Sequence, residues 1–271
     1  GIISGRSDKV LDPSDTIPEG HGIMSSNTHH ELTEHILNPD SEVRGVWIAT
    51  VNNINFPSKK GLDALALKRE LDDILSTCIK NGINAVYFQV RPSGDALYKS
   101  ELFPTSEYLT GKQGAPLAGG FDPLEYLVKT AHENNIKVHA WVNPLRASYG
   151  TKAKPSHSTD TLAETNPARI NPDYTVAYGD GKLYYNAGIP EVRELVANGV
   201  AEIVCGYDVD GVVFDDYFYP YASYTDGELD VFDDTDAYAK YGGNKALDDW
   251  RRENINTLIK LCHDTVKGID P

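Results

Sequence analysis

Residues 208–220 read DVDGVVFDDYFYP, and this stretch is the most informative about the fold. Its centre, residues 211–214, is short and apolar, as expected of a strand that is buried on both faces. Two carboxylates, Asp215 and Asp216, follow directly. In parallel α/β proteins the functional groups lie at the carboxyl ends of the strands. The stretch therefore predicts a buried parallel strand that ends in a functional site.

Three earlier strands and four amphipathic helices extend this pattern in both directions. The strands are predicted at 43–50, 85–90 and 137–142. The helices have apolar stripes over 67–79, 124–131, 191–205 and about 245–266. Alternation of this kind predicts a parallel α/β fold, either a doubly wound sheet or a (β/α)8 TIM barrel. No Gly-x-Gly-x-x-Gly follows the first strand and the connections after the strands are long, so we expect about the first four βα units of a TIM barrel.

Composition restricts the classes of partner. The 271 residues include 40 acidic and 25 basic side chains, a formal charge of −15 that would repel nucleic acid but is compatible with a glycan. No apolar run is long enough for a membrane span, and a secretory signal has either been removed or was never present. Cys78, Cys205 and Cys262 lie far apart without metal-ligand spacing. We predict three buried free thiols, no metal and no cofactor.

The chain divides into residues 1–41, predicted to be an irregular arm or linker, and residues 42–271, predicted to be the N-terminal half of the barrel. Two patterns that suggest metal binding are set aside. The run from His29 to His35 matches neither zinc-protease motif. The acidic run from Asp226 to Asp236 lacks the spacing of a Ca²⁺ loop and is interpreted as a solvated loop.

The strand ends combine polar and aromatic side chains, a mixture that suits sugars. Aromatic rings stack on the apolar face of a pyranose, while charged and amide groups bind its hydroxyls. Hydrolysis of a glycosidic bond needs one carboxylate at the oxocarbenium-like centre and a second carboxyl that protonates the leaving oxygen. The catalytic candidates are Asp215 and Asp216. The candidates for binding substrate are Arg91, Asp95, Asn143, Arg146, Trp47, Trp141, Tyr217 and Tyr219.

Each candidate has a structural alternative. Asp215 and Asp216 are adjacent and point to opposite sides of an extended strand, so in the functional interpretation only one of them faces the barrel mouth. In the structural alternative, both aspartates cap the following segment or form ion pairs. Arg91 and Asp95 either clamp a substrate or form one salt bridge, and Asn143 with Arg146 presents the same choice. Trp47 and Trp141 are core residues or sugar platforms. His139, in mid-strand, is expected to be a core histidine.

Four motifs in the same order resemble the bacterial glycosyl hydrolase-like 10 family. They are RGVW at 44–47, QVRPSGDALY at 89–98, AWVNPLR at 140–146 and the stretch at 208–220, and the resemblance extends from about residue 42 to the end. It implies a TIM barrel, secretion or lipoprotein anchoring, and action on bacterial cell-wall peptidoglycan. Members similar to this chain include an enzyme that cuts glycan strands stripped of their stem peptides. The protein is thus expected to be extracellular or in the cell envelope. The spacing of Asp210 and Asp215 also resembles the fourth-strand nucleophile motif of α-amylase-type barrels.

Strands five to eight of such a barrel, with any carboxylate they carry, are not in the chain. Either it is a fragment, inactive alone, or a second chain or copy completes the ring. The alternative function is a non-catalytic glycan-binding or scaffold protein on a barrel-derived fold. A metal-dependent amidohydrolase or deacetylase is disfavoured because no His-x-His follows the first strand.

Overall fold

The structure, a computed structural model, describes residues 42–215 and 218–271. The described residues from Val43 onward belong to one compact unit. The predicted arm at 1–41, including the His29–His35 run, lies outside the described residues.

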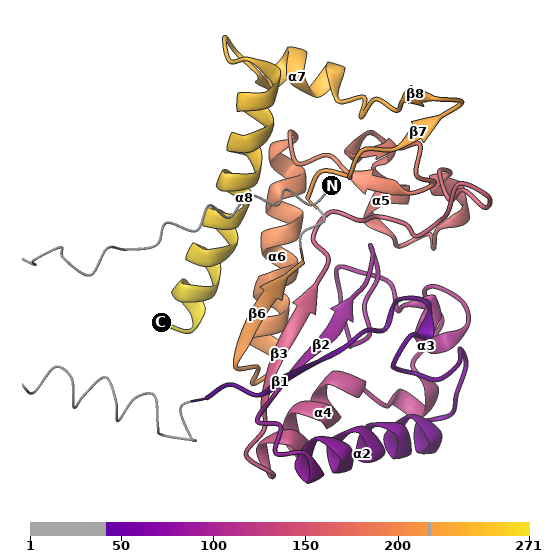
Figure 1. Cartoon of the computed structure of the whole chain (residues 1–271), viewed down its shortest axis with the longest axis vertical. Coiled ribbons are helices and arrows are strands. Elements are labelled where there is room, and N and C mark those ends of the chain that lie inside the picture. Colours follow the sequence, from indigo (N-terminus) through magenta and orange to yellow (C-terminus); the bar gives the residue numbers. More distant parts are fainter. Residues whose placement is uncertain (1–41, 216–217) are drawn as a thin grey trace, which may run out of the picture. The chain divides into compact units, whose positions relative to one another are not determined.

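A four-stranded parallel sheet in the order β1-β2-β3-β6 organises this unit (Figure 1). Its strands are β1 (Gly45–Ile48), β2 (Ala85–Arg91), β3 (Lys137–Val142) and β6 (Gly211–Phe214). The register pairs Trp47 with Tyr87, Gln89 with Trp141, and Trp141 with Val213. All four predicted strands and their parallel direction are confirmed. Because the strands run the same way, the residues that follow them come together at one edge of the sheet.

Four long helices separate or follow these strands. They are α2 (Ala64–Lys80), α4 (Pro123–His132), α6 (Pro190–Gly206) and α8 (Leu247–Ile269). Helix α4 begins directly after Asp122, whose carboxylate accepts hydrogen bonds from the backbone N–H groups of Leu124 and Glu125. The apolar stripe of α2 ends one residue earlier than predicted, because Ile79 in its last turn is 48% exposed.

The hydrophobic core lies on one face of the sheet. Alternate residues of β2 and β3, such as Phe88 and Ala140, are fully buried against Leu71 of α2, Leu127 of α4 and Ile203 of α6. A second cluster joins α6 to α8, which lie side by side (Figure 1). Packing helices on this face fixes which side chains of each strand are left for the opposite face.

The connections after the strands are long, as predicted, and contain short elements that the sequence analysis missed. The β2–α4 connection holds α3 (Glu107–Thr110), and the β3–α6 connection holds α5 (Pro167–Ile170), β4 (Thr175–Ala177) and β5 (Leu183–Tyr185). The β6–α8 connection holds β7 (Tyr224–Thr225), β8 (Glu228–Leu229) and α7 (Thr235–Tyr241). Single-turn 3₁₀ helices lie at 51–53, 118–120, 159–161 and 172–174.

The interpretation of 226–236 as a solvated loop is wrong in part. Asp226 and Gly227 both adopt positive φ, 52° and 87°, and form the turn of the β7–β8 hairpin. An Asp-Gly pair is a strong hairpin signal, because both central residues of such a turn need that conformation. The acidic residues after it lead into α7.

The cysteine prediction holds for two of the three thiols. Cys78 and Cys262 are buried, and burial raises the pKa of both, that of Cys262 to about 11. Cys205 is exposed, which corrects the prediction. It lies in the last turn of α6, where the helix extends past the core that covers its neighbour Ile203.

Candidate active site at the end of β6

The structure decides which side chains face away from the helices. Phe214 and Val212 pack with the core clusters, so Val213 and Asp215 belong to the opposite face. Val213 pairs in register with Trp141 of β3, and Trp141 pairs with Gln89 of β2. In a closed barrel this face would be the interior. Asp215 therefore has the inward phase that the sequence left open.

Asp215 is held by two donors from the neighbouring strand. Its Oδ2 accepts hydrogen bonds from Trp141 Nε1 at 3.2 Å and from Asn143 Nδ2 at 3.1 Å. The side chain is half-buried. An ionised carboxylate only accepts hydrogen bonds, and both partners present N–H groups. The arrangement thus fixes a carboxylate at the carboxyl end of β6.

Asn143 is itself oriented by the backbone around it. Its N–H donates to the carbonyl of Arg91 at 2.9 Å, and its Oδ1 accepts from the backbone N–H of Arg146 at 2.9 Å. With Oδ1 used in this way, Nδ2 is the group that points to Asp215. Asn143 thus lies beside Asp215, and the turn at 143–146 positions its amide.

A wall of aromatic rings adjoins this carboxylate. Trp47 stacks on Tyr87 with ring centroids 4.6 Å apart and meets Trp141 edge-on at 5.0 Å. Tyr87 stacks in turn on His139 at 4.9 Å, and partial burial lowers the pKa of that histidine. Trp47 is 49% exposed in the described part of the chain, and the choice between a core residue and a sugar platform stays open for it, because this face would be the interior of a closed barrel.

Two members of this face were missed by reading only the residues that follow each strand. Tyr87 lies within β2, two residues before Gln89. Residues two apart in a strand point to the same face, and this alternation was the sequence signal that could have identified Tyr87. Gln89 Oε1 accepts hydrogen bonds from the backbone N–H groups of Thr50 and Val51, at 2.9 and 3.0 Å. Gln89 thereby ties the end of β1 to β2 and supports the edge at which the site lies.

Arg146 lies on the far side of Asn143 and is almost fully buried. Its Nε donates to the carbonyl of Pro92 at 2.9 Å, and its guanidinium lies 5.5 Å from the ring centre of Tyr149. It connects the turn after β3 with the turn after β2. Its role as a substrate ligand stays a prediction.

Arg91 is directed away from this site, toward α6. Its guanidinium lies 3.9 Å from the ring centre of Phe103, and the side chain is 1% exposed. A Cβ on Gly199 of α6 would lie 2.1 Å from Arg91 Nη1, so only glycine leaves room for it. Its Nε and Nη1 have no hydrogen-bond partner among the described residues.

Asp95 is equally buried and belongs to a different network. Its Oδ2 accepts from Gln113 Nε2 at 3.1 Å, and burial raises its pKa to about 6. In the described part of the chain no ion pair joins Asp95 to Arg91, so the salt-bridge alternative is wrong. Binding of substrate by this pair stays a prediction, with both side chains enclosed by protein.

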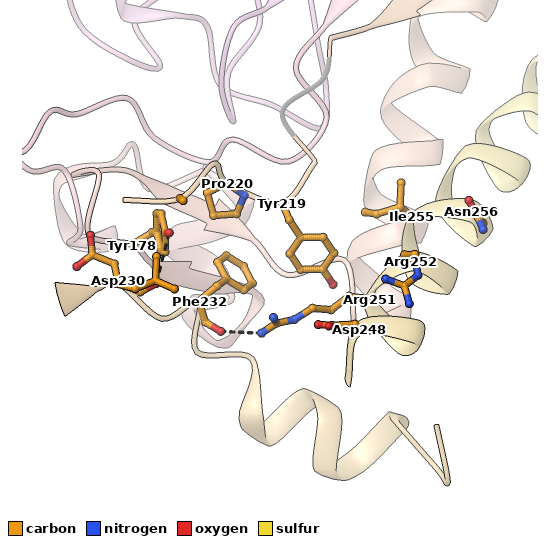
Figure 2. Close-up of a pocket in the computed structure, with 12 residues that line it drawn as sticks. Tyr178, Tyr219, Pro220, Asp230, Phe232, Asp248, Arg251, Arg252, Ile255 and Asn256 are labelled. Carbon is orange, nitrogen blue, oxygen red and sulfur yellow. Dashed lines mark hydrogen bonds between the residues drawn. The ribbon is translucent and has the colours of Figure 1, made fainter. Parts of the chain in front are cut away.

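The remaining predicted residues fall into two groups. Asp216 and Tyr217 lie outside the described residues. Tyr219 lies in a separate cavity, with its ring centre 5.4 Å from that of Phe232, and burial raises its pKa to about 12 (Figure 2).

Within 42–215 and 218–271, no group of three or more acidic, histidine or cysteine side chains is arranged to hold a metal ion. No helix in those residues has both the length and the apolar character to cross a membrane.

The fold is that of a TIM barrel, of which the described residues form four βα units. An α-L-fucosidase (isoenzyme 2) from Paenibacillus thiaminolyticus superposes with a TM-score of 0.54 over 85% of this chain and 31% of its own, at 15% sequence identity. That likeness concerns the fold alone.

The chain belongs to the glycosyl hydrolase-like 10 family, whose sequence profile matches residues 42–271. The glycosyl hydrolase YngK of Bacillus subtilis (strain 168) is 43% identical over 235 residues, which are 86% of this chain and 44% of YngK. The glycosyl hydrolase DigH of Escherichia coli (strain K12) is 37% identical over 240 residues, 84% of this chain and 53% of DigH. The chain thus spans about half the length of these relatives.

Proposed function

We propose that this chain forms the N-terminal half of the catalytic barrel of a glycoside hydrolase that acts on bacterial cell-wall glycan. The observation that carries the proposal is the position of Asp215, at the carboxyl end of β6 and bound by Trp141 Nε1 and Asn143 Nδ2. The family membership supports it. Asp215 serves as the nucleophile or as the charge that stabilises the reacting carbon.

The chemistry follows from what a carboxylate can do beside a sugar ring. Departure of the leaving group places positive charge on the anomeric carbon and ring oxygen, and a carboxylate close to that carbon traps or stabilises it. The two donors keep Asp215 in one orientation, so little reorganisation is needed as the charge develops. A second carboxyl must protonate the leaving oxygen. We expect it at the end of a strand that faces Asp215 across the completed barrel.

The aromatic wall gives the site a means of holding the sugar. Trp47 and Trp141 adjoin Asp215 on the same face of the sheet, and Trp47 is half-exposed in the described part of the chain. The apolar face of a pyranose stacks on such rings, while amide groups bind its hydroxyls. Stacking here would set the anomeric carbon over the carboxylate.

We extend the proposal to the substrate and the location of the protein. The motifs shared with the family favour peptidoglycan strands from which stem peptides have been removed, and such strands lie in the cell envelope or outside the cell. Both relatives are named only as glycosyl hydrolases. In the full-length protein the rest of the ring comes from the remaining chain or from a second copy.

The test is Asp215→Asn in the full-length protein. The substitution keeps the shape of the side chain but removes its charge. The release of reducing ends from cell-wall glycan stripped of stem peptides should fall at least about 100-fold, the lower end of the loss when one group that stabilises charge in the transition state is removed. The matched control is Asp226→Asn, in the exposed turn of the β7–β8 hairpin, which should leave turnover unchanged.

Three results are informative. Loss in Asp215→Asn alone, with an unchanged circular dichroism spectrum, supports the proposal. Turnover retained in Asp215→Asn removes that residue from the mechanism. A full-length wild-type protein that binds the glycan but releases no reducing ends would instead be a non-catalytic glycan-binding protein.

A further inference from the structure

A cavity of about 560 Å³ lies apart from the carboxylate of Asp215, between the segment that follows β6 and the first turns of α8 (Figure 2). Its size is within the range of small-ligand pockets. Tyr219, one of its walls, is four residues from Asp215, so their Cα atoms are at most about 14 Å apart. A glycan chain held at Asp215 therefore has only a few sugar units to span before it reaches the cavity.

The walls combine three kinds of surface. Rings of Tyr178, Tyr219 and Phe232 line it, as do the aliphatic groups of Leu229 from β8 and Ile255 from α8. The ionised side chains balance, since two aspartates, Asp230 and Asp248, are matched by two arginines, Arg251 and Arg252. A cavity without an excess of either charge does not select an ion. Its aromatic, aliphatic and hydrogen-bonding surfaces match an uncharged sugar that also carries a methyl group.

The cavity is held in shape by contacts that do not use a ligand. Arg251 donates to the carbonyl of Phe232 at 3.0 Å, as Figure 2 shows, and forms an ion pair with the buried Asp234. The Tyr178 hydroxyl accepts from the backbone N–H of Ser223 at 3.2 Å. A site that is already formed loses little conformational entropy when a ligand enters.

Two polar side chains at the cavity remain available to a ligand. Arg252 has a side chain that is 68% exposed, and its ion pair is with the equally exposed Asp249, a contact that contributes little in water. Asn256 is exposed and carries an amide that both donates and accepts. An acetamido group presents the complementary donor and acceptor together with a methyl group for Ile255, which precedes Asn256 in α8.

We infer that this cavity is a binding subsite for an N-acetylated, uncharged hexosamine unit of a glycan chain, several units from the bond that is cut. The inference rests on the proposed function for the identity of the chain that is bound.

The test uses the full-length protein carrying Asp215→Asn, so that hydrolysis does not consume the probe. The probes are soluble β-1,4-linked N-acetylglucosamine oligomers of two and six units, and the measurement is calorimetric affinity. Ala222→Trp, at an exposed lining position, fills the cavity, and Asn256→Ala removes its amide. The matched control is Lys260→Ala, exposed on the same helix but absent from the lining.

Each cavity variant should weaken binding of the six-unit oligomer about tenfold, equivalent to about 1.4 kcal/mol. Binding of the two-unit oligomer at Asp215 should not change, and Lys260→Ala should behave as the parent. Equal affinities of parent and cavity variants for the longer oligomer would overturn the inference. A parallel loss for both oligomers would overturn it too, because it would show damage to the whole site.

The two proposals fail in different ways. Absence of turnover by the wild type on cell-wall glycan would contradict the catalytic proposal but leave the length-dependent affinities unaffected. Normal turnover with no length-dependent effect of Ala222→Trp or Asn256→Ala would contradict the subsite alone. Asn256→Ala removes only an exposed side chain, so it also serves if Ala222→Trp disturbs folding.

Discussion

Replacing Asp95 by asparagine tests how the connection after β2 responds to pH. The Asp95 carboxyl is only 2% exposed, and it follows β2 in the loop that carries Gln113. Burial raises its pKa from the usual 3.8 to about 6, and this outweighs hydrogen bonds from Gln113 and Ser106 that lower it. The folded protein therefore favours the neutral acid.

The sign of the pH dependence follows from comparing the two states. Below about pH 4 the carboxyl is protonated in both the folded and the unfolded chain, and its contribution to stability is complete. Between about pH 4 and about 6 the unfolded chain ionises while the folded protein keeps the neutral acid, so the free energy of unfolding falls. The loss is complete once the pH has passed through about 6 and the buried carboxyl has ionised as well. From 3.8 to about 6 is roughly two pH units. At about 1.4 kcal/mol for each unit, the loss is about 3 kcal/mol.

Asparagine imitates the neutral acid at every pH. We expect the unfolding free energy of Asp95→Asn, relative to wild type, to rise by about 3 kcal/mol between about pH 4 and pH 7. Urea-induced unfolding of the full-length protein, followed by tryptophan fluorescence at several pH values, measures this difference. Other titrating groups cancel, because the two proteins are compared at the same pH.

Two further variants make the test specific. Asp160→Asn changes the formal charge equally at an exposed position, and its difference from wild type should not vary with pH in this way. Gln113→Leu removes a hydrogen-bond donor that lowers the pKa of Asp95, so the loss of stability should move to higher pH. A constant difference between Asp95→Asn and wild type from pH 4 to 7 would refute the reasoning.

Two other predictions concern packing and thiol reactivity. Gly199→Ala would place a Cβ 2.1 Å from Arg91 Nη1. Because the guanidinium is enclosed, the variant should lose about 1–3 kcal/mol of unfolding free energy, measured by urea denaturation. An unchanged unfolding midpoint would show that Arg91 can move aside. Under native conditions a maleimide reagent should modify Cys205 quickly, while Cys78 and Cys262 react only after unfolding. Mass spectrometry of digested protein identifies the modified thiol, and rapid labelling of either buried one would contradict the burial described here.

The sequence by itself was sufficient for the parallel sheet, for the four main helices and for choosing the strand ends as the place of the candidate site. These features depend on local patterns, namely apolar runs for buried strands and helical spacing of apolar residues. The motifs shared with the family also fall within single strands and the turns that follow them. Such patterns are readable because the residues that make them are neighbours in the chain.

Only the tertiary structure decided which of these residues act together. Asp215 is more than seventy residues from Trp141 and Asn143, and their hydrogen bonds depend on the register of β3 with β6. Arg91, a candidate for binding substrate, packs against Phe103 of the same connection, where Gly199 of α6 leaves it a space. No local pattern encodes a choice between two faces of a sheet. That choice is made by the helices, which cover one face with apolar side chains and leave the other to the site.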